Sequence, residues 1–182
     1  MSRPLTEEEK TFLLDLARET IRSRLEERPL PVPDPPPGPL TEPRGAFVTL
    51  KKGGELRGCI GHVVGLEPLW QSVRDNAINA AFRDPRFPPL EPGELDLVRL
   101  EVSALTPLRD VDSPEEVRVG EHGLMIERGP YRGLLLPQVP VEYGWDRETF
   151  LDHTCRKAGL PPGCWRDPST RLRVFSAEVF SE

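Results

Sequence analysis

The sequence predicts an α+β protein in which a mainly antiparallel sheet is flanked by helices. Pairs of strand-like segments are separated by short turns that contain glycine, and segments with helical apolar spacing lie between those pairs. Strands joined by such tight turns form antiparallel hairpins. Helices set between hairpins are typical of the α+β class. With 182 residues, the chain is long enough for one large domain or two small subdomains.

The first expected element is a helix that begins after Thr6 and ends near Pro29. Thr6 and Glu9 have the spacing of a capping box, and the apolar residues that follow keep the helical period. Residues 29–43, PLPVPDPPPGPLTEP, are too rich in proline for a helix or an internal strand. We expect them to form a stiff, extended surface connector. A docking site for an SH3-like partner is the less favoured alternative.

Two β-hairpins are expected, because two pairs of strand-like segments each flank a dipeptide typical of turns. They are AFVTLKK and ELRGCIGHV around Gly53-Gly54, and GLMIER and YRGLLLPQV (residues 131–139) around Gly129-Pro130.

Four further elements follow from local patterns. An apolar stripe predicts a helix from Pro68 to Phe82. Residues 97–105, LVRLEVSAL, alternate between apolar and polar residues, which predicts a half-buried strand. Asp146 caps a helix that Gly159 closes. The tail RLRVFSAEVF, residues 171–180, is predicted to be one final strand.

Composition narrows the functional class. The net charge is −6 and the sequence pI is about 5.3, which argues against the broad basic surface of a nucleic-acid-binding protein. No apolar run is long enough for a transmembrane helix, and the N-terminal residues do not resemble a secretory signal. Cys59, Cys155 and Cys164 are too few and too scattered for a disulfide framework. We therefore expect a reduced, cytoplasmic protein that binds no membrane.

The segment ELRGCIGHV is the strongest candidate for a functional site. In a regular strand Arg57 and Cys59 share one face, while Leu56 and Ile60 point to a core. An arginine beside a cysteine favours the thiolate, which is the reactive form. Arg57 would then bind an anionic group, and Cys59 would act as a nucleophile or contact the ligand. The alternative is a buried Cys59 that acts only as a small apolar residue.

Two glycines and a carboxylate extend this candidate site. Gly58 and Gly61 are costly inside a strand, and they are tolerated where a ligand or another backbone approaches closely. Glu101 lies on the polar face of its strand with Ser103. If that face meets Cys59, Glu101 becomes a candidate for general acid or base catalysis.

The loop after the second helix carries two further candidates, Arg83 and Arg86, on either side of Asp84. The favoured interpretation is a structural salt bridge that pins the loop. The alternative is an anion-binding edge, because arginine suits phosphate and carboxylate groups.

A zinc site is disfavoured, and no cofactor is expected. Cys59 and His62 are three residues apart on a strand and point to opposite faces. His153 and Cys155 are two residues apart on a helix, about 200° around its axis.

The chain resembles the AMMECR1 domain family. The family's hallmark hexapeptide is similar to LRGCIG at residues 56–61, and further blocks follow in the same order. These blocks are AAFRDPRFPPL (80–90), LEVSALTPL (100–108) and GLLLPQVPVEYGWDRETFLDHTCRKAGLPPGCW (133–165). The resemblance implies that residues 1–182 form a single domain in which a larger and a smaller subdomain meet at a cleft, with the hexapeptide near it.

The resemblance brings no established reaction, but it implies a shared pathway with Memo-like and radical SAM proteins. Together with the residues, it leads us to expect an enzyme or enzyme subunit. The substrate would be small and anionic or nucleotide-like, and it would bind in an inter-subdomain cleft lined by Arg57 and Cys59. A non-catalytic adaptor for those partners is the alternative, and a nucleic-acid-binding protein is the least favoured.

Overall fold

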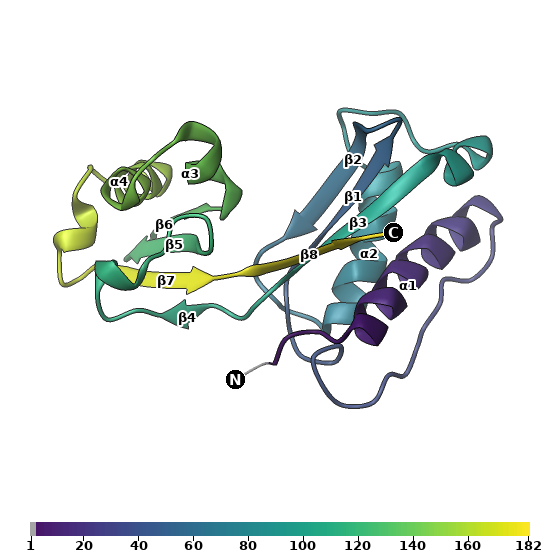
Figure 1. Ribbon diagram of the computed structural model, residues 1–182, viewed down its shortest axis with the longest axis horizontal. Helices are drawn as coiled ribbons and strands as arrows, with labels where there is room; N and C mark the ends of the chain where they lie inside the picture. The colour runs from purple at the N-terminus through teal and green to yellow at the C-terminus, as the bar shows by residue number, and fades with distance from the viewer. Residues whose placement is uncertain (1–2) are drawn as a thin grey trace. The chain divides into compact units, whose positions relative to one another are not determined.

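The computed structural model describes residues 3–182 and confirms the α+β class. Its strands form two four-stranded sheets. The chain divides into two compact units: unit 1 comprises residues 3–107 with Glu178–Glu182, and unit 2 comprises Leu108–Ala177. Figure 1 shows that each unit has its own sheet and its own helices. Within residues 3–182, no helix combines the length and the apolar character needed to span a membrane.

Unit 1 is a sheet with the strand order β2-β1-β3-β8 and two long helices on one face. Buried side chains of both helices share one core with Val48 and Leu50 of the central strand β1. The elements are α1 (Glu7–Leu25), β1 (Ala46–Lys52), β2 (Glu55–His62), α2 (Leu69–Phe82), the 3-10 helix η1 (Pro92–Leu97), β3 (Val98–Leu105) and β8 (Ala177–Ser181).

The first helix begins as predicted. The Thr6 side chain accepts from the Glu9 N–H, and the Glu9 side chain accepts in return from the Thr6 N–H. This is the expected capping box, and it satisfies donors that the first turn leaves unpaired.

The proline-rich connector is irregular, and its C-terminal part is anchored. Residues 28–36 contain no helix or strand. From Gly38 onward the chain turns, and Leu40 is buried in the core of unit 1. The carbonyl of Leu40 also accepts from the N–H of Trp70 at 3.1 Å, at the start of α2. The segment is therefore attached to the helix that follows the hairpin.

Unit 2 has the strand order β4-β7-β5-β6, and α4 contributes buried residues to its core. Asp146 caps α4 as predicted, because its side chain accepts from the Thr149 N–H at 2.8 Å. The elements are β4 (Arg109–Asp110), η2 (Pro114–Glu116), β5 (Gly123–Arg128), β6 (Tyr131–Leu135), α3 (Gln138–Tyr143), α4 (Arg147–Lys157), η3 (Cys164–Arg166) and β7 (Arg171–Phe175).

The predicted bounds of two strands are wrong. The strand expected over 131–139 ends at Leu135, and the short helix α3 follows. Pro137 has no N–H for a strand ladder, and Pro140 lies in the first turn of α3, where an N–H needs no helical partner. The strand expected over 171–180 is two strands, β7 in the sheet of unit 2 and β8 in the sheet of unit 1.

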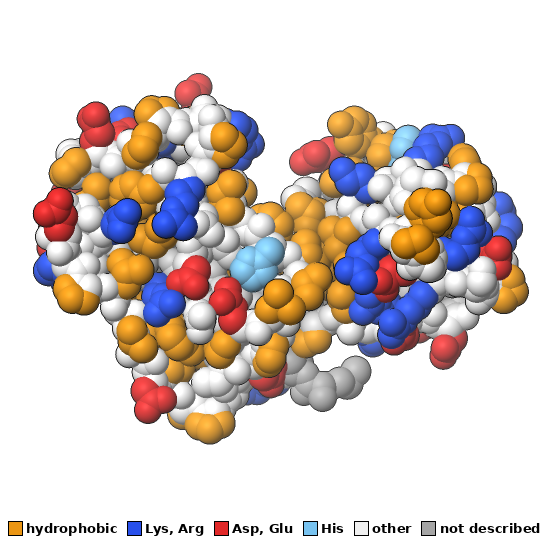
Figure 2. Space-filling model, turned by 180° about the vertical axis from the view of Figure 1, so that it is seen from behind, with side chains coloured by type: hydrophobic (Ala, Val, Ile, Leu, Met, Phe, Trp, Pro, Cys, Tyr) orange, Lys and Arg blue, Asp and Glu red, His pale blue; other side chains and the backbone are white. Residues whose placement is uncertain are grey.

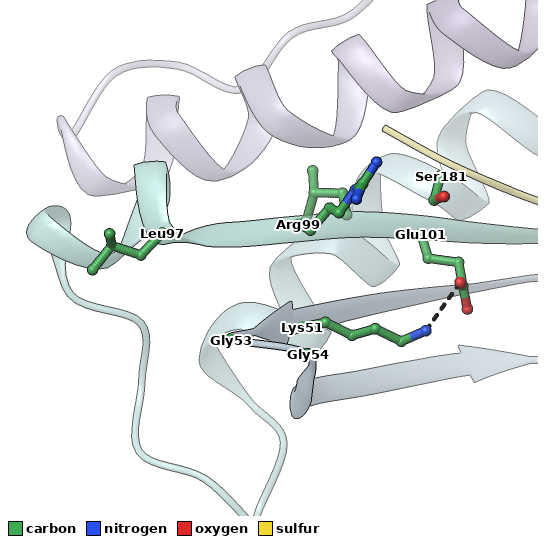
Figure 3. Close-up of a pocket in the computed structure, with 8 residues that line it drawn as sticks. Lys51, Gly53, Gly54, Leu97, Arg99, Glu101 and Ser181 are labelled. Carbon is green, nitrogen blue, oxygen red and sulfur yellow. Dashed lines mark hydrogen bonds and ion pairs between the residues drawn. The ribbon is translucent and has the colours of Figure 1, made fainter.

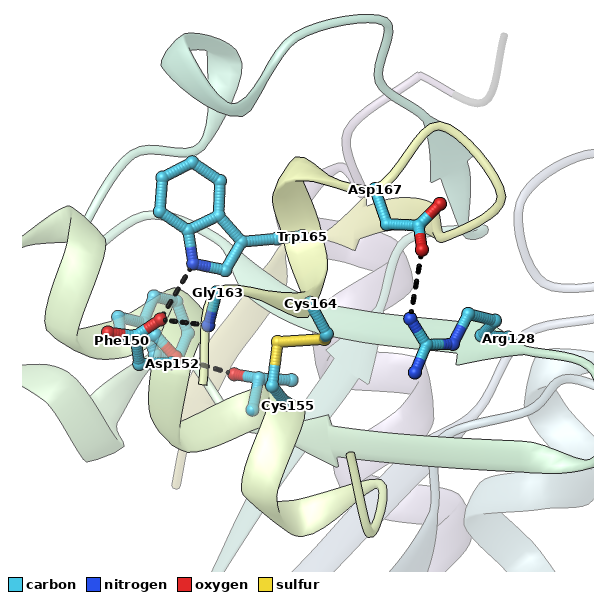
Figure 4. The surroundings of a disulfide bond; sticks show 9 residues. Arg128, Phe150, Asp152, Cys155, Gly163, Cys164, Trp165 and Asp167 are labelled. Carbon is cyan, nitrogen blue, oxygen red and sulfur yellow. Dashed lines mark hydrogen bonds and ion pairs between the residues drawn. A yellow bond between two sulfur atoms is a disulfide. The ribbon is translucent and has the colours of Figure 1, made fainter. Parts of the chain in front are cut away.

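A disulfide joins Cys155 of α4 to Cys164 of η3, so the expectation of three reduced cysteines is wrong. The two Cα atoms are 6.1 Å apart. Asp152 holds the same turn, since one of its carboxylate oxygens accepts from the Gly163 N–H and from the indole N–H of Trp165, each at 2.8 Å (Figure 4). Sequence spacing did not show that the chain folds back after α4.

We predict that reduction of this disulfide destabilises the protein. A crosslink that closes so short a loop contributes about 2–3 kcal/mol through the unfolded state. Urea unfolding with and without a phosphine reductant should show a loss of that size, which the Cys164→Ala variant should reproduce without reductant. Cys59→Ser is the control and should respond to the reductant as the wild type does. A wild-type unfolding midpoint that the reductant leaves unchanged would contradict this prediction.

Candidate functional site on the outer face of the first sheet

Three side chains from neighbouring strands form a row across the first sheet. Thr49 in β1 is paired with Cys59 in β2 on one side and with Glu101 in β3 on the other. Val48 and Leu50 flank Thr49 and are fully buried toward the helices, so Thr49 points to the opposite face. Directly paired residues of adjacent strands share a face. We call Cys59, Thr49 and Glu101 the central row.

The face that carries the central row lies opposite α1 and α2, and we call it the outer face. All three residues of the central row are half-buried on it. By the same strand register, the outer face also includes Phe47, Lys51, Gly61, Arg99 and Ser103. A catalytic role for Glu101 was predicted on the condition that its strand face also carries Cys59. The two residues do share that face.

Cys59 is a free thiol in a polar setting. It is half-buried, and the Thr49 hydroxyl donates to its Sγ at 3.2 Å. Its side chain therefore lies on the outer face and not inside the helix-covered core, where the alternative interpretation placed it.

The backbone of Cys59 is held as well. Because β2 is an edge strand, its outward N–H and C=O groups have no neighbouring strand to bond. The side chains of Asp84 and Arg86 are the hydrogen-bond partners of the Cys59 backbone instead. The Cys59 N–H donates to Asp84 Oδ2 at 3.0 Å, and Arg86 Nη2 donates to the Cys59 carbonyl at 3.2 Å.

Asp84 and Arg86 form the structural salt bridge that the sequence favoured. Their closest N···O distance is 2.7 Å, and the Asp84 side chain is only 1% exposed. The Asp84 carboxylate also accepts from the Arg86 N–H. Hydrogen bonding to Arg86 is the largest cause that holds the pKa of Asp84 well below its usual range. Arg83 is exposed and donates to the side chain of Asn79 within its own helix.

Arg57 lies in a different place from the one predicted. The β1–β2 register shifts after Leu50, so Arg57 is an extra residue in β2 between two paired positions. Its guanidinium makes two hydrogen bonds to Glu94 of η1, each at 3.1 Å. Lys52, which alternates with Lys51 and so points to the helix side, reaches the same carboxylate at 3.0 Å. Arg57 is thus on the opposite face from Cys59.

The bulge has two further consequences. Leu56, expected in the core, is 42% exposed. Arg57 is buried and Glu94 is half-buried, and the hydrogen bond from Arg57 is the main cause that lowers the pKa of Glu94 to about 2. The guanidinium predicted to bind an anion is therefore already bound to a carboxylate of the protein.

The protein itself occupies the space beside the two strand glycines. A Cβ at Gly58 would lie 2.1 Å from the Ala80 carbonyl oxygen of α2, and a Cβ at Gly61 would lie 2.4 Å from the Phe47 ring. Gly58 allows the helix to approach the sheet, and Gly61 makes room for an aromatic side chain. The close approach predicted for a ligand or a backbone is in both cases internal packing.

Two cations on the outer face were missed at the sequence level. Lys51 bonds Glu101 at 3.1 Å, and Arg99 is paired directly with Lys51 in the β1–β3 register. The signal was available, because alternation along AFVTLKK places Lys51 on the same face as Thr49.

His62 has a structural role on the helix side of the sheet. Its Nδ1 lies 3.1 Å from the side-chain amide nitrogen of Asn76, and its Nε2 lies 3.3 Å from the Ser72 hydroxyl. The Ser72 hydroxyl itself donates to the Arg44 carbonyl, so it accepts from a protonated Nε2. Cys59 and His62 thus point to opposite faces, as alternation predicted.

The fold and the site define a class of protein with two α+β units and a half-buried cysteine on the outer face of its first sheet. The chain belongs to the AMMECR1 family, which matches residues 14–180.

Relatives and one solved structure agree with this assignment. A protein of Methanothermobacter thermautotrophicus is 49% identical over 98% of this chain and 97% of its own length. Protein NEQ441 of Nanoarchaeum equitans is 48% identical over 93% of this chain and 98% of its own length. The crystal structure of the uncharacterised protein PH0010 from Pyrococcus horikoshii is similar with a TM-score of 0.74 at 45% identity, covering 94% of this chain and 90% of that one. These relatives carry no named activity.

We predict that Asp84→Asn destabilises unit 1. All four hydrogen bonds that the Asp84 carboxylate accepts come from N–H donors, and the amide nitrogen of an asparagine would face some of them. Loss of charged hydrogen bonds of this kind costs about 1.5–3 kcal/mol each. Because folding lowers the Asp84 pKa, its stabilisation is complete well above the ordinary aspartate value of about 3.9 and disappears as the pH falls below it.

Urea unfolding of both proteins at a series of pH values tests this. The difference in unfolding free energy should be largest near neutral pH and should shrink below about pH 4. Arg83→Gln is the matched control and should have little effect, since Arg83 is exposed and bonds only within its helix. A difference that stays constant with pH would show that the charge of Asp84 is not responsible.

Proposed function

We propose that the protein is an enzyme, or a subunit of one, that binds a small anionic or nucleotide-like substrate on the outer face of unit 1 next to Cys59. The observation that supports this most is the central row, in which a free thiol, a hydroxyl and a carboxylate from three strands lie side by side. Such groups bind, attack and transfer protons in many enzyme sites.

The central row suggests a division of roles. The Cys59 thiol would lose its proton to water. Its Sγ would then form a bond to an electrophilic carbon of the substrate, while the bond from that carbon to its leaving group breaks and the leaving group keeps the electron pair. Thr49 would hold the sulfur through the hydrogen bond that it already donates. Neighbouring strands are about 4.8 Å apart, so Glu101 is two strand spacings from Cys59. Glu101 would therefore transfer protons on the substrate and not on the thiol itself.

We predict that Cys59 reacts in the native protein. With Cys155 and Cys164 in a disulfide, Cys59 is the single free thiol, so iodoacetamide labels one site. The labelling rate, followed by mass spectrometry, should equal or exceed that of glutathione at the same pH. Thr49→Val, which keeps the shape and removes the hydroxyl, should slow the reaction several-fold. Cys59→Ser is the control for labelling elsewhere.

The opposite result is also clear. A native rate far below that of glutathione, which recovers only in urea, would show a thiol shielded by packing and would exclude the nucleophile role.

A second candidate function is a non-catalytic adaptor, and exposed hydrophobic residues in unit 2 favour it. Val141 and Tyr143 of α3 are 61% and 68% exposed, and Tyr143 stacks on Trp145 with ring centroids 5.0 Å apart. Figure 2 shows hydrophobic side chains at the surface among acidic and basic ones. Exposed apolar groups of this kind are used in protein binding. The partners proposed from the family resemblance are a Memo-like and a radical SAM protein.

We predict for the adaptor that co-purification with those two proteins depends on α3. The wild type should retain at least one of them, and a variant with Val141→Ser and Tyr143→Ser should lose it, because the apolar contact is gone. Val32→Ser is the matched control, since Val32 is 75% exposed but lies in the proline-rich connector. If the wild type retains neither the Memo-like protein nor the radical SAM protein, the adaptor function is ruled out.

A further inference from the structure

We infer that Lys51 and Arg99 together form a binding site for the anionic group of a ligand, a phosphate or a carboxylate, beside the central row. This inference deepens the proposed function, because it names the residues that would hold the anionic part of the substrate. Both residues and the groups around them belong to unit 1.

The first observation is a pair of like charges. Lys51 and Arg99 occupy directly paired positions on β1 and β3, so their side chains leave the sheet on the same face. Two like charges in that arrangement destabilise a sheet. An anion between or above them would remove that cost.

The two cations have different partners within the protein. Lys51 bonds Glu101 at 3.1 Å, while Arg99 donates from both Nε and Nη2 to the main-chain oxygen of Glu182. The Glu182 carboxylate is bound to Arg18 and to the Leu100 N–H. Lys51 is thus paired with the Glu101 carboxylate, and Arg99 is bonded to the main chain at Glu182.

The second observation is a hollow at the same place. It has a volume of about 490 Å³, within the range of small-molecule sites, and Lys51, Arg99, Glu101 and Ser181 line it (Figure 3). The Gly53-Gly54 turn also lines it, and a Cβ at either glycine would meet nothing within 4 Å.

The third observation is the position of this hollow relative to Cys59. Lys51 lies two residues beyond Thr49 on β1, which is about 7 Å along the same face. The other arginines expected near the thiol already bind protein carboxylates, Arg57 to Glu94 and Arg86 to Asp84. Lys51 and Arg99 are the outer-face cations in the hollow next to the central row.

The test is an NMR titration of the ¹⁵N-labelled protein with inorganic phosphate and, separately, with malonate, against sodium chloride at equal ionic strength. Phosphate or malonate should shift the amide signals of Lys51, Gly53, Gly54 and Arg99 beyond the effect of chloride. Lys51→Gln and Arg99→Gln should each weaken binding at least about tenfold, which is 1.4 kcal/mol. A response to phosphate alone, or to malonate alone, assigns the class of anion.

Two variants make the result specific. Lys52→Gln is the matched control, because Lys52 is the next residue, points to the other face and pairs with Glu94; it should leave binding unchanged. Glu101→Gln should tighten binding, since it removes the one carboxylate that competes for Lys51. Such an increase in affinity cannot come from a loss of folding, and the NMR spectra report folding directly.

The inference is overturned if neither anion acts beyond chloride, or if Lys52→Gln weakens binding as much as Lys51→Gln does. Cys59→Ser should bind the anion as the wild type does, so this result is independent of thiol reactivity. A reactive Cys59 without anion binding would leave the proposed function standing and remove only this site.

Discussion

The pairing of β1 with a strand on each side is the constraint on which the candidate site depends. Val48 and Leu50 are fully buried against the helices, and a shift by one residue would expose them and bury Thr49. The hydrophobic core therefore fixes the register of β1. That register in turn places Thr49 between Cys59 and Glu101, so packing on one face of the sheet sets the spacing of polar groups on the other.

The bulge at Arg57 is the one departure from this regular pattern of β1 pairing. It places Arg57 and Cys59 on opposite faces of the sheet. Without the extra residue, alternation would put Arg57 beside Cys59. With it, the guanidinium reaches Glu94 on the helix side, where both side chains are largely buried. Removing one partner of such a pair costs about 3–5 kcal/mol, because it leaves the other charge buried and unpaired. Arg57 is thus part of the scaffold at the start of β2, and the outer face takes its cations from β1 and β3.

Much of this fold follows from local sequence patterns, whereas the differences come from contacts between distant residues. The capping box at Thr6, the cap at Asp146 and the hairpin at Gly53-Gly54 were predicted because each depends on a few adjacent residues. The bulge depends on Glu94, far along the chain, and the disulfide depends on how η3 folds back on α4. The division of residues 171–180 between two sheets does have a local signal that the prediction of one strand missed, because the apolar alternation changes phase at Val174-Phe175.

The arginine that contacts Cys59 is Arg86 and not Arg57. Arg86 lies 27 residues further along the chain and donates to the Cys59 carbonyl. The pKa of Arg86 is raised above its ordinary value chiefly by its hydrogen bond to Asp84. Because Asp84 is neutralised by Arg86, its carboxylate can hold the Cys59 backbone without placing an uncompensated negative charge next to the thiol. One ion pair thereby fixes the strand edge at Cys59 through its backbone N–H and carbonyl.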